Sequence, residues 1–385
     1  MPAPLPAGGV PGVPSVIGHM KTHTAVALLM LLALPAGAFA APEPKVDHYV
    51  HLTPENSAIG NFPARKAPIL TVKSGAVVKV DTGGGAGWRN AKQDPDAWLK
   101  ENGVPTTMAD NQALRETQLV LEKTPRDAGI ENGHLLVGPI AIDGAMPGDS
   151  LEVRILSVVP RIPYGTTGRT PGRGLRQTDS DRPPNKVTIL DLKRNVGVFE
   201  AGVEVPLGPF MGVMGVMPAA SQGPNRRSGP PGAFGGNFDC KELVAGSTLY
   251  LPIFQKGALF FTGDAHAAQG DGEISGTAIE TANTATFQFI LHKGKTLASP
   301  RAETSTHYIT FGLDPDLDNA MQMAVDDMVD LLQEMKGWDM FRTIPLASIG
   351  VDFRVTQVVD GTKGIHAMIP KKLFVNDKTE YWYKP

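Results

Sequence analysis

Glycine and proline interrupt this chain so often that long helices have little room. The sequence contains 43 glycines and 33 prolines in 385 residues, whereas aromatic residues make up only 6%. Both residues favour turns, and turns this frequent favour short strands over a helical bundle. With 42% hydrophobic residues, the chain can bury one large core or two modest ones. We therefore expect a globular, β-rich protein.

Alternation of apolar and polar residues indicates where the strands lie. Residues 67–82 carry β-branched residues on both sides of a Lys-Ser-Gly turn, and residues 134–160 contain a turn at Met-Pro-Gly-Asp. A period of two residues is typical of paired strands. These stretches predict a mainly β fold with some helix.

Two segments interrupt this pattern. Residues 83–132 begin with the tract GGGAGW and are polar, with helix-like pieces near 96–101 and 110–122. We interpret them as an excursion over the sheet. Residues 165–195 are rich in Arg, Gly, Pro and Asp, which predicts a long surface loop.

One long helix is predicted in the C-terminal part, residues 300–385. Asp314 can cap it, Pro315 suits the first helical position, and Gly337 stands at its end. The apolar residues between them recur at a spacing of three and four, which is typical of a helix packed on a core. The methionines in this stripe are therefore core residues rather than cofactor ligands.

The N-terminus has the form of an export signal. A lysine and a histidine precede an apolar run at 25–34, and Ala38-Phe39-Ala40 suits cleavage before Ala41. No later segment approaches the ~20 apolar residues of a membrane span. We expect residues 1–40 to be removed and residues 41–385 to form one folded unit, periplasmic or secreted, outside the membrane.

Charge and motifs exclude several classes of function. The formal net charge of -3 lacks the basic excess of a nucleic-acid-binding protein. The sequence has no nucleophile elbow, no dinucleotide or Walker loop, no HExxH and no paired CxxC motif. These absences weaken the case for nucleotide use and for serine hydrolysis of the elbow type.

The stretch GDAHAAQGDGE gathers side chains that bind metals and transfer protons. Asp264 and His266 share a face if the strand continues to 266, since side chains at i and i+2 point the same way. Such a pair can hold a divalent ion such as zinc, and Glu273 across the loop can then act as base and acid. The alternative is a solvated acidic turn.

A second stretch, GGNFDCKEL, offers oxygen ligands. Asn237 and Asp239 lie on one face of an extended segment, although their side chains can equally close a turn after the two glycines. Cys240, the only cysteine, shares the other face with Phe238, which favours a buried inert thiol. The alternative is a nucleophile assisted by its two charged neighbours.

In chain order, these stretches resemble the acetamidase/formamidase family. The resemblance runs from roughly residue 46 to 375, and its most specific piece is GDAHAAQGDGE. It implies a sandwich- and barrel-like β-rich fold with a C-terminal α+β part. It also implies hydrolysis of short aliphatic amides, such as formamide or acetamide, to the acid and ammonia. Family members look metal-dependent, and homo-oligomers are usual.

The resemblance also suggests a set of metal ligands. Asp264 and His266 match the family's Gly-Asp-x-His element, Asp239 matches Gly-Gly-Asn-x-Asp, and His134 matches the histidine before its Gly-Pro. We predict that these four residues hold a divalent ion, with zinc preferred and calcium second. Without the resemblance, His134 would be read as a surface histidine.

The same elements suggest catalytic and substrate-binding residues. Glu273 is the predicted base and acid, Asp264 supports it, and Asn237 is a candidate donor to the developing oxyanion. Gly236 and Gln269 are predicted to bind the substrate, a small amide.

Two departures from the family leave alternatives open. The family pattern has no cysteine at position 240, and its typical members are cytoplasmic. An exported binding protein with structural calcium is the alternative from another class. Hydrolysis of another C–N bond, in a cyclic or amino-acid amide, is the third.

Overall fold

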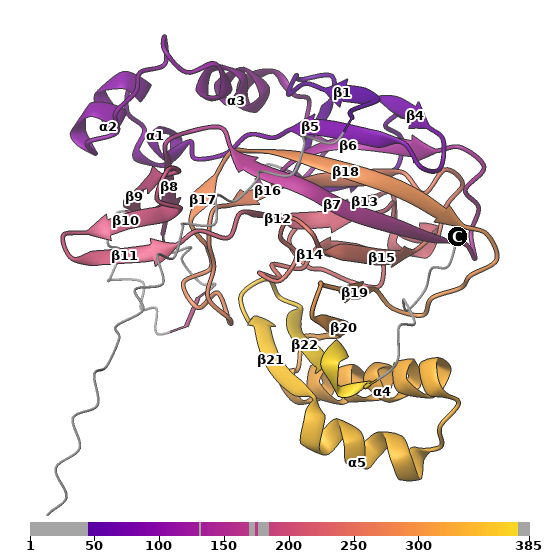
Figure 1. The fold of residues 1–385 in the computed structure, drawn as a ribbon. Coiled ribbons are helices and arrows are strands. Elements are labelled where there is room, and N and C mark those ends of the chain that lie inside the picture. Colours follow the sequence, from indigo (N-terminus) through magenta and orange to yellow (C-terminus); the bar gives the residue numbers. More distant parts are fainter. Residues whose placement is uncertain (1–44, 131, 169–173, 176–184, 376–385) are drawn as a thin grey trace, which may run out of the picture. The chain divides into compact units, whose positions relative to one another are not determined.

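The computed structural model describes residues 45–130, 132–168, 174–175 and 185–375 (Figure 1). The predicted leader, residues 1–40, lies outside the described residues. Contacts group residues 44–385 into one compact unit. Within the described ranges, no helix is both long enough and apolar enough to cross a membrane.

One layer is a nine-stranded sheet, counted over the described residues. Its neighbours are antiparallel except for the first two strands. The order is β1 (His48–Val50), β5 (Val77–Asp81), β18 (Asn283–His292), β7 (Ser150–Pro160), β15 (Thr248–Pro252), β19 (Arg301–Glu303), β20 (His307–Asp314), β22 (Lys363–Pro370) and β21 (Asp352–Gln357).

The second sheet carries most of the predicted site residues. Its main path, within the described part, is β11 (Val203–Pro206), β10 (Val196–Glu200), β9 (Lys186–Asp191), β8 (Tyr164–Thr167), β17 (Glu280–Thr281), β16 (Phe260–His266), β12 (Phe210–Gly215) and β14 (Gly235–Asn237). A branch joins through β6 (Leu135–Ile142), which pairs with β16, β2 (Ser57–Ile59) and β4 (Leu70–Val72). A separate ribbon pairs β3 (Asn61–Pro63) with β13 (Asn225–Arg227).

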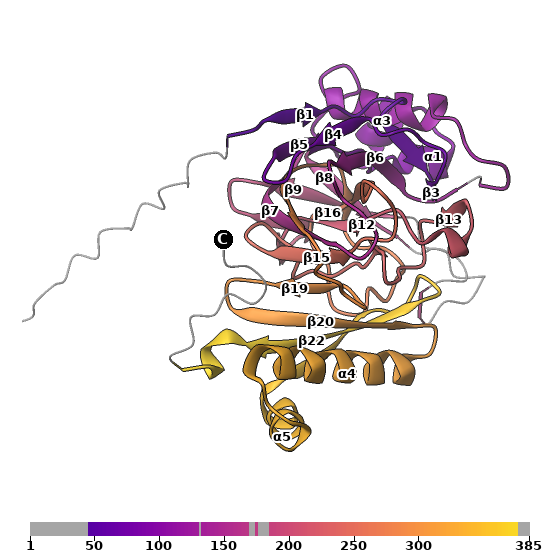
Figure 2. The same cartoon turned by 90° about the vertical axis from the view of Figure 1, so that its right-hand side faces the viewer.

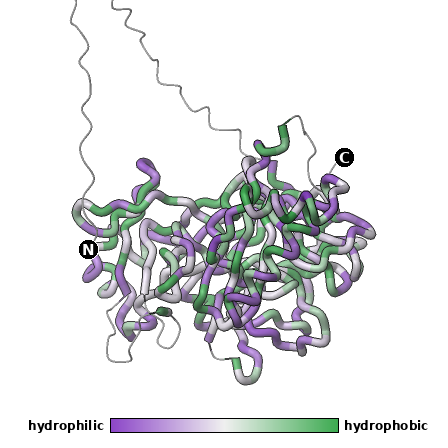
Figure 3. The backbone as a smooth tube through the Cα atoms, turned by 90° about the horizontal axis from the view of Figure 1, so that it is seen from below, coloured by the Kyte–Doolittle hydropathy of each residue, from purple (hydrophilic) through white to green (hydrophobic). Residues whose placement is uncertain are grey.

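The main core lies between these sheets. Phe260 of β16 packs edge-on against Phe287 and Phe289 of β18, with ring centroids 5.6 and 5.0 Å apart. All three rings are fully buried, and burying each is worth about 1.5–3 kcal/mol. Along the tube in Figure 3, hydrophobic and hydrophilic colours change at short intervals, as they do in strands with one buried face. The predicted mainly β, sandwich-like fold is confirmed.

The polar excursion folds as three helices that pack with β8. They are α1 (Gly87–Ala91), α2 (Pro95–Glu101) and α3 (Gln112–Lys123). Trp98 of α2 lies 5.9 Å, ring centre to ring centre, from Tyr164 of β8. A side chain at Gly87 would collide with Trp98, so the glycine tract allows α1 and α2 to approach closely.

The prediction of a long loop at 165–195 is wrong at both ends of this range, where the structure has strands. Residues 165–167 belong to β8 and residues 186–191 form β9, and the two strands pair antiparallel. β-branched residues from Val187 to Ile189 drive this pairing, but the surrounding Arg, Gly and Pro conceal it in the sequence. The intervening residues 169–173 and 176–184 lie outside the described part.

A C-terminal α+β layer completes the unit. Helix α4 (Leu317–Lys336) lies along β20 and β22, with α5 (Met340–Gly350) beyond it (Figure 2). The predicted helix cap at Asp314 is wrong, since Asp316 accepts hydrogen bonds from the backbone of residues 318 and 319. Asp314 instead ends β20. Gly337 ends α4, as predicted, and adopts the left-handed conformation.

Candidate functional site

The end of β16 brings Asp264 and His266 together. The His266 ring is 1% exposed, and its Nε2 lies 3.4 Å from Asp264 Oδ2. Strand β17 pairs with β16 so that Glu280 stands opposite His266, and Glu280 Oε1 lies 3.2 Å from the same Nε2. One imidazole nitrogen therefore faces two carboxylates.

Asp239 approaches the other nitrogen of this ring. It follows β14, the strand paired with β12, and its Oδ1 lies 4.0 Å from His266 Nδ1. Asn237 Nδ2 donates a 2.9 Å hydrogen bond to Asp239 Oδ2, and Gln269 Nε2 donates at 2.6 Å to the Asp239 carbonyl. Both amides therefore hold Asp239 in place.

His134 lies beside Asp264 at the start of β6. Its Nε2 is 3.8 Å from Asp264 Oδ2, and its Nδ1 is 3.0 Å from Ser228 Oγ. Because β6 pairs with β16, residues 130 positions apart in the chain meet at one point. A hydroxyl partner on one ring nitrogen orients the other toward the carboxylate.

The backbone is strained at three of the site's carboxylates. Asp239, Asp264 and Glu273 have φ values of 51°, 55° and 43°. They are three of the seven described non-glycine residues with positive φ. Such conformations cost of order 1–3 kcal/mol each and cluster at functional sites. The left-handed backbone directs these three side chains to positions that regular strand geometry would not give them.

The donor atoms leave a space that suits a cation. Two groups have ligand atoms within 4.8 Å of one another: Asp239, His266 and Glu273, and Asp264, His266 and Glu280. Asp239 Oδ1 and both His266 ring nitrogens are buried without an aligned hydrogen bond. A Cβ placed on Gly212 would lie only 2.5 Å from Asp239 Oδ1 and 2.7 Å from Asp264 Oδ2. These residues fit a divalent ion, because glycine keeps the point of convergence clear.

Burial and mutual repulsion favour the protonated form of two carboxyls. Burial, then the charges of Glu273 and Asp360, raise the pKa of Asp239 well above its ordinary value. Burial also raises the pKa of Glu273, and Glu280 adds to this while His266 opposes it. A carboxyl with a raised pKa can both accept and donate a proton near neutral pH.

Asp264 and His266 show the opposite pattern, that of an ion pair. Burial opposes ionisation of Asp264, but His134 and His266 outweigh it and lower the pKa of Asp264. Burial likewise lowers the pKa of His266, yet Glu280 and Asp264 raise it well above its ordinary value. The proton on His266 and the ionised carboxylate of Asp264 thus occupy the positions that a cation and its ligand would take.

The cluster opens into a cavity of about 1160 Å³. Its lining includes His134, Asn237, Asp239, Asp264, Glu273, Glu280 and Asp360, together with Asn90, Trp98 and Glu101 from the helical excursion. Of the described residues that line it, none is lysine or arginine. The excursion therefore forms one wall of an acidic cavity.

The structure gathers most of the predicted residues and adds two. Gly236 and Gln269 are not among the described residues that line the cavity, and Gln269 supports Asp239 instead. Glu280 and Asp360 were not predicted. The register of β16 with β17 places Glu280, and Asp360 follows β21, so only strand pairing could have revealed them.

The thiol of Cys240 does not fit the nucleophile alternative. It is 1% exposed and is absent from the described cavity lining. Burial and the charge of Glu242 raise the pKa of the Cys240 thiol, so the nucleophilic thiolate is disfavoured. Lys241, the proposed helper, instead pairs with Asp271 and Glu242.

Comparison with known proteins identifies the family of this chain. The family model described as Acetamidase/Formamidase family matches residues 116–225 and 219–376, about two thirds of the chain. The chain belongs to the acetamidase/formamidase family. The earlier resemblance is thereby confirmed. The matched residues include every proposed ligand and Glu273, whereas α1 and α2 precede them.

Curated relatives match over part of their length. A formamidase of Methylophilus methylotrophus is 29% identical over 207 residues, covering 39% of this chain and 49% of the relative. An acetamidase of Mycolicibacterium smegmatis is 28% identical over 214 residues, covering 39% and 51%. The chain thus spans about half the length of the curated relatives it matches.

Solved structures match over nearly their whole length. An acetamidase from Bacillus halodurans superposes with a TM-score of 0.69 at 26% identity, covering 86% of this chain and 100% of the other. A predicted acetamidase/formamidase from Thermoanaerobacter tengcongensis gives 0.68 at 26% identity, covering 85% and 98%. The family fold is therefore common to these chains.

Proposed function

We propose that this chain is a metal-dependent amidohydrolase that cleaves a short aliphatic amide, of the formamide or acetamide type, to a carboxylate and ammonia. One observation carries this proposal. Carboxylate oxygens of Asp239 and Asp264 converge beside Gly212, where His266 presents the Cε1 edge between its two ring nitrogens, and the Glu273 carboxyl lines the same cavity. The names of the relatives support the substrate class.

We assign Asp264, Glu280 and His266 Nε2 to the ion, with His134 beside Asp264 and Asp239 facing the other ring nitrogen. Mixed nitrogen and oxygen donors suit zinc, whereas calcium takes oxygen ligands only. His266 at the centre of the cluster therefore argues against the alternative of a binding protein with structural calcium. A divalent ion supplies Lewis acidity, which polarises an amide carbonyl and makes water a stronger acid.

Glu273 moves the proton in this proposal. Its carboxylate takes one proton from water as the water oxygen bonds to the carbonyl carbon. It then gives that proton to the amide nitrogen as the C–N bond breaks, which releases ammonia. Asn237 was predicted to bind the oxyanion, but its amide nitrogen is held by Asp239, so we assign it a positioning role.

The cavity supports a second candidate, an amide larger than acetamide. A volume of about 1160 Å³ far exceeds the few atoms of formamide. The lining carboxylates Glu101 and Asp360 add to the negative charge beyond the proposed ligands. Such a cavity favours an ammonium group over a carboxylate on the substrate, as in an amino-acid amide.

Ammonia release from a substrate panel tests both candidates. The panel contains formamide, acetamide, propionamide, a cyclic amide and glycinamide, each with and without a chelator. We expect hydrolysis that stops on chelation and returns with zinc. Activity that survives complete metal removal would disprove the metal-dependent mechanism, and inactivity of the metal-loaded protein on every amide would favour the binding-protein alternative.

We also propose that the protein is exported and assembles as a homo-oligomer. The signal-like residues 1–40 support export, and the family resemblance supports assembly. Mass spectrometry of the mature protein tests cleavage before Ala41. Light scattering at several concentrations tests assembly, and a monomer throughout would disprove it.

A further inference from the structure

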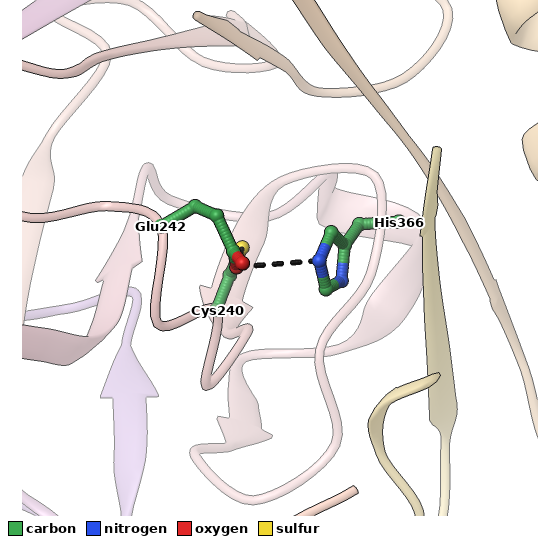
Figure 4. Close-up of side chains that lie close together, drawn as sticks. All are labelled: Cys240, Glu242 and His366. Carbon is green, nitrogen blue, oxygen red and sulfur yellow. Dashed lines mark hydrogen bonds and ion pairs between the residues drawn. The ribbon is translucent and has the colours of Figure 1, made fainter. Parts of the chain in front are cut away.

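A second cluster of ligand-type side chains lies outside the cavity. Cys240 and Glu242 follow β14, and His366 stands on β22 of the other sheet (Figure 4). Glu242 Oε2 lies 3.4 Å from Cys240 Sγ and 3.2 Å from His366 Nε2. None of the three is among the described residues that line the cavity.

These separations match the spacing of ligands around one ion. Tetrahedral zinc binds sulfur at about 2.3 Å and nitrogen or oxygen at about 2.0–2.2 Å, which places neighbouring ligand atoms roughly 3.3–3.6 Å apart. All three ligand atoms of the cluster lie within 4.8 Å of one another. The side chains therefore supply three of the four ligand positions of a tetrahedral ion.

The orientation of His366 supports the same conclusion. Its Nδ1 lies 2.8 Å from Thr356 Oγ1, which fixes the ring and turns Nε2 toward Glu242. The ring is fully buried, and Nε2 has no aligned hydrogen bond. A metal-bound histidine characteristically has such a partner on its other nitrogen.

The local charges are divided between the two oxygens of Glu242. Lys241 Nζ and Arg354 Nη1 lie 3.0 and 3.3 Å from Oε1, whereas Oε2 faces the sulfur and the imidazole. The two bases are themselves paired with other acids, because Lys241 contacts Asp271 and Arg354 lies 3.9 Å from Asp352. A thiolate and a carboxylate would balance the two charges of a divalent ion.

We propose that Cys240, Glu242 and His366 form a second binding site for a thiophilic divalent metal of the zinc class. The site is structural, since it is buried and apart from the cavity. Cys240 directly follows Asp239, and the Thr356 carbonyl accepts a 3.1 Å hydrogen bond from the Gly272 backbone, next to Glu273. A bound ion would therefore hold both loops that present the carboxylates of the cavity.

Cobalt substitution of the full mature chain tests this site independently of amide hydrolysis. A thiolate bound to Co²⁺ gives a charge-transfer band in the near ultraviolet, and Cys240 is the only cysteine that can produce it. We expect the band in the wild type and its loss in Cys240→Ser, with one metal ion fewer per chain. Asp264→Asn, which alters only the cavity cluster, should keep the band.

Two results of this experiment would overturn the proposal. If the wild type binds cobalt without a thiolate band, the three side chains form a network held by protons alone. If Asp264→Asn also abolishes the band, the thiol belongs to the metal of the cavity. Should Cys240→Ser fail to fold, X-ray absorption of the zinc-loaded wild type decides, since the site requires a sulfur neighbour at about 2.3 Å.

Discussion

The cavity cluster and the C-terminal layer both bury carboxylates, but only the C-terminal layer pairs them with an arginine. In that layer Arg301, which is 5% exposed, places Nη2 2.7 Å from Asp327 and Nη1 2.7 Å from Glu334. Among the described residues that line the cavity, His134 is the only basic one beside six carboxylates.

This difference separates a structural ion pair from a binding site. Buried charges are costly unless they are paired, so a chain that pairs them itself gains a stable layer. Where carboxylates and a histidine surround a space without a paired arginine or lysine, a bound cation can instead compensate the cost of burying their charge. Asp327 is therefore part of the fold, whereas the carboxylates near His266 are those that the proposed function requires.

The largest expected effect is on catalysis. Glu273→Gln keeps the shape of the side chain but removes proton transfer, so we expect ammonia release to fall about 10²–10⁴-fold. Metal content should stay unchanged. Glu204→Gln, on exposed β11, is the matched control and should retain full activity. A fully active Glu273→Gln enzyme would refute the assignment of this residue.

The ion pair of the C-terminal layer should affect stability instead. Arg301→Met leaves Asp327 largely buried without its partner, so we expect a loss of about 3 kcal/mol in the free energy of unfolding. Denaturant titration measures it. The activity of the folded fraction should not change. Arg194→Met, in an exposed pair, should cost less than about 1 kcal/mol.

A methyl group at the point of convergence should block the ion. In Gly212→Ala, Cβ would lie within 3 Å of Asp239, Asp264 and His266 atoms. We expect zinc affinity to fall about 10–100-fold, as for perturbed metal sites. Gly208→Ala, whose Cβ meets only Val244 at 3.8 Å, is the control. Equal zinc affinity in both variants would show that the ion lies elsewhere.

The pH dependence of stability should distinguish metal-free from metal-loaded protein. In the metal-free fold the pKa values of Asp239, Glu273 and His266 are raised. A raised pKa means that the folded state binds protons more tightly, so its stabilisation is present at low pH and is lost as pH rises through the folded pKa. Asp264, with its lowered pKa, contributes the opposite trend, in acid below its ordinary pKa of 3.8.

We therefore expect metal-free protein to lose stability as pH rises above the ordinary carboxyl range, near 4.5 for glutamate. Added zinc should reverse this slope, because the ion replaces the protons. Thermal unfolding with and without chelator measures both slopes. Identical slopes of stability against pH, with and without chelator, would contradict the idea that the carboxylates around His266 need a cation to balance their charge.

The smallest effect on activity should come from a substitution in the cavity wall that the helical excursion forms. Glu101 is exposed on α2, so its charge is screened and worth less than about 1 kcal/mol. Glu101→Gln should raise KM for glycinamide about two- to fivefold and leave acetamide unchanged. An equal change for both substrates would argue against recognition of an ammonium group by this wall.

The sequence predicts the part of the site that lies close together in the chain. Asp264 and His266 are two residues apart at the end of one strand and a loop returns Glu273, but the left-handed backbone at Asp264 is not visible in the sequence. Glu280 is not predicted, because its place depends on which residue of β17 pairs with His266. Asp360 depends in turn on where β21 ends.

Other features of the site and fold depend on partners that composition does not show. Asn237 carries the amide expected of an oxyanion donor, and one of its two N–H groups donates to Asp239 two residues away. Strands β8 and β9 form despite a loop-like composition, because they pair with each other, and β8 also pairs with β17 and β9 with β10. Amino-acid composition does not show which partner a side chain or a strand takes.

The left-handed backbone at Asp239, Asp264 and Glu273 sets a limit for engineering. Glycine would adopt those φ values without strain, so replacement there would relieve a cost of order 1–3 kcal/mol at each position. Each such replacement would also remove an oxygen from the cavity. At these three positions, thermostability and chemistry cannot be improved together, and a library selected for heat resistance alone should drift toward inactive glycine variants.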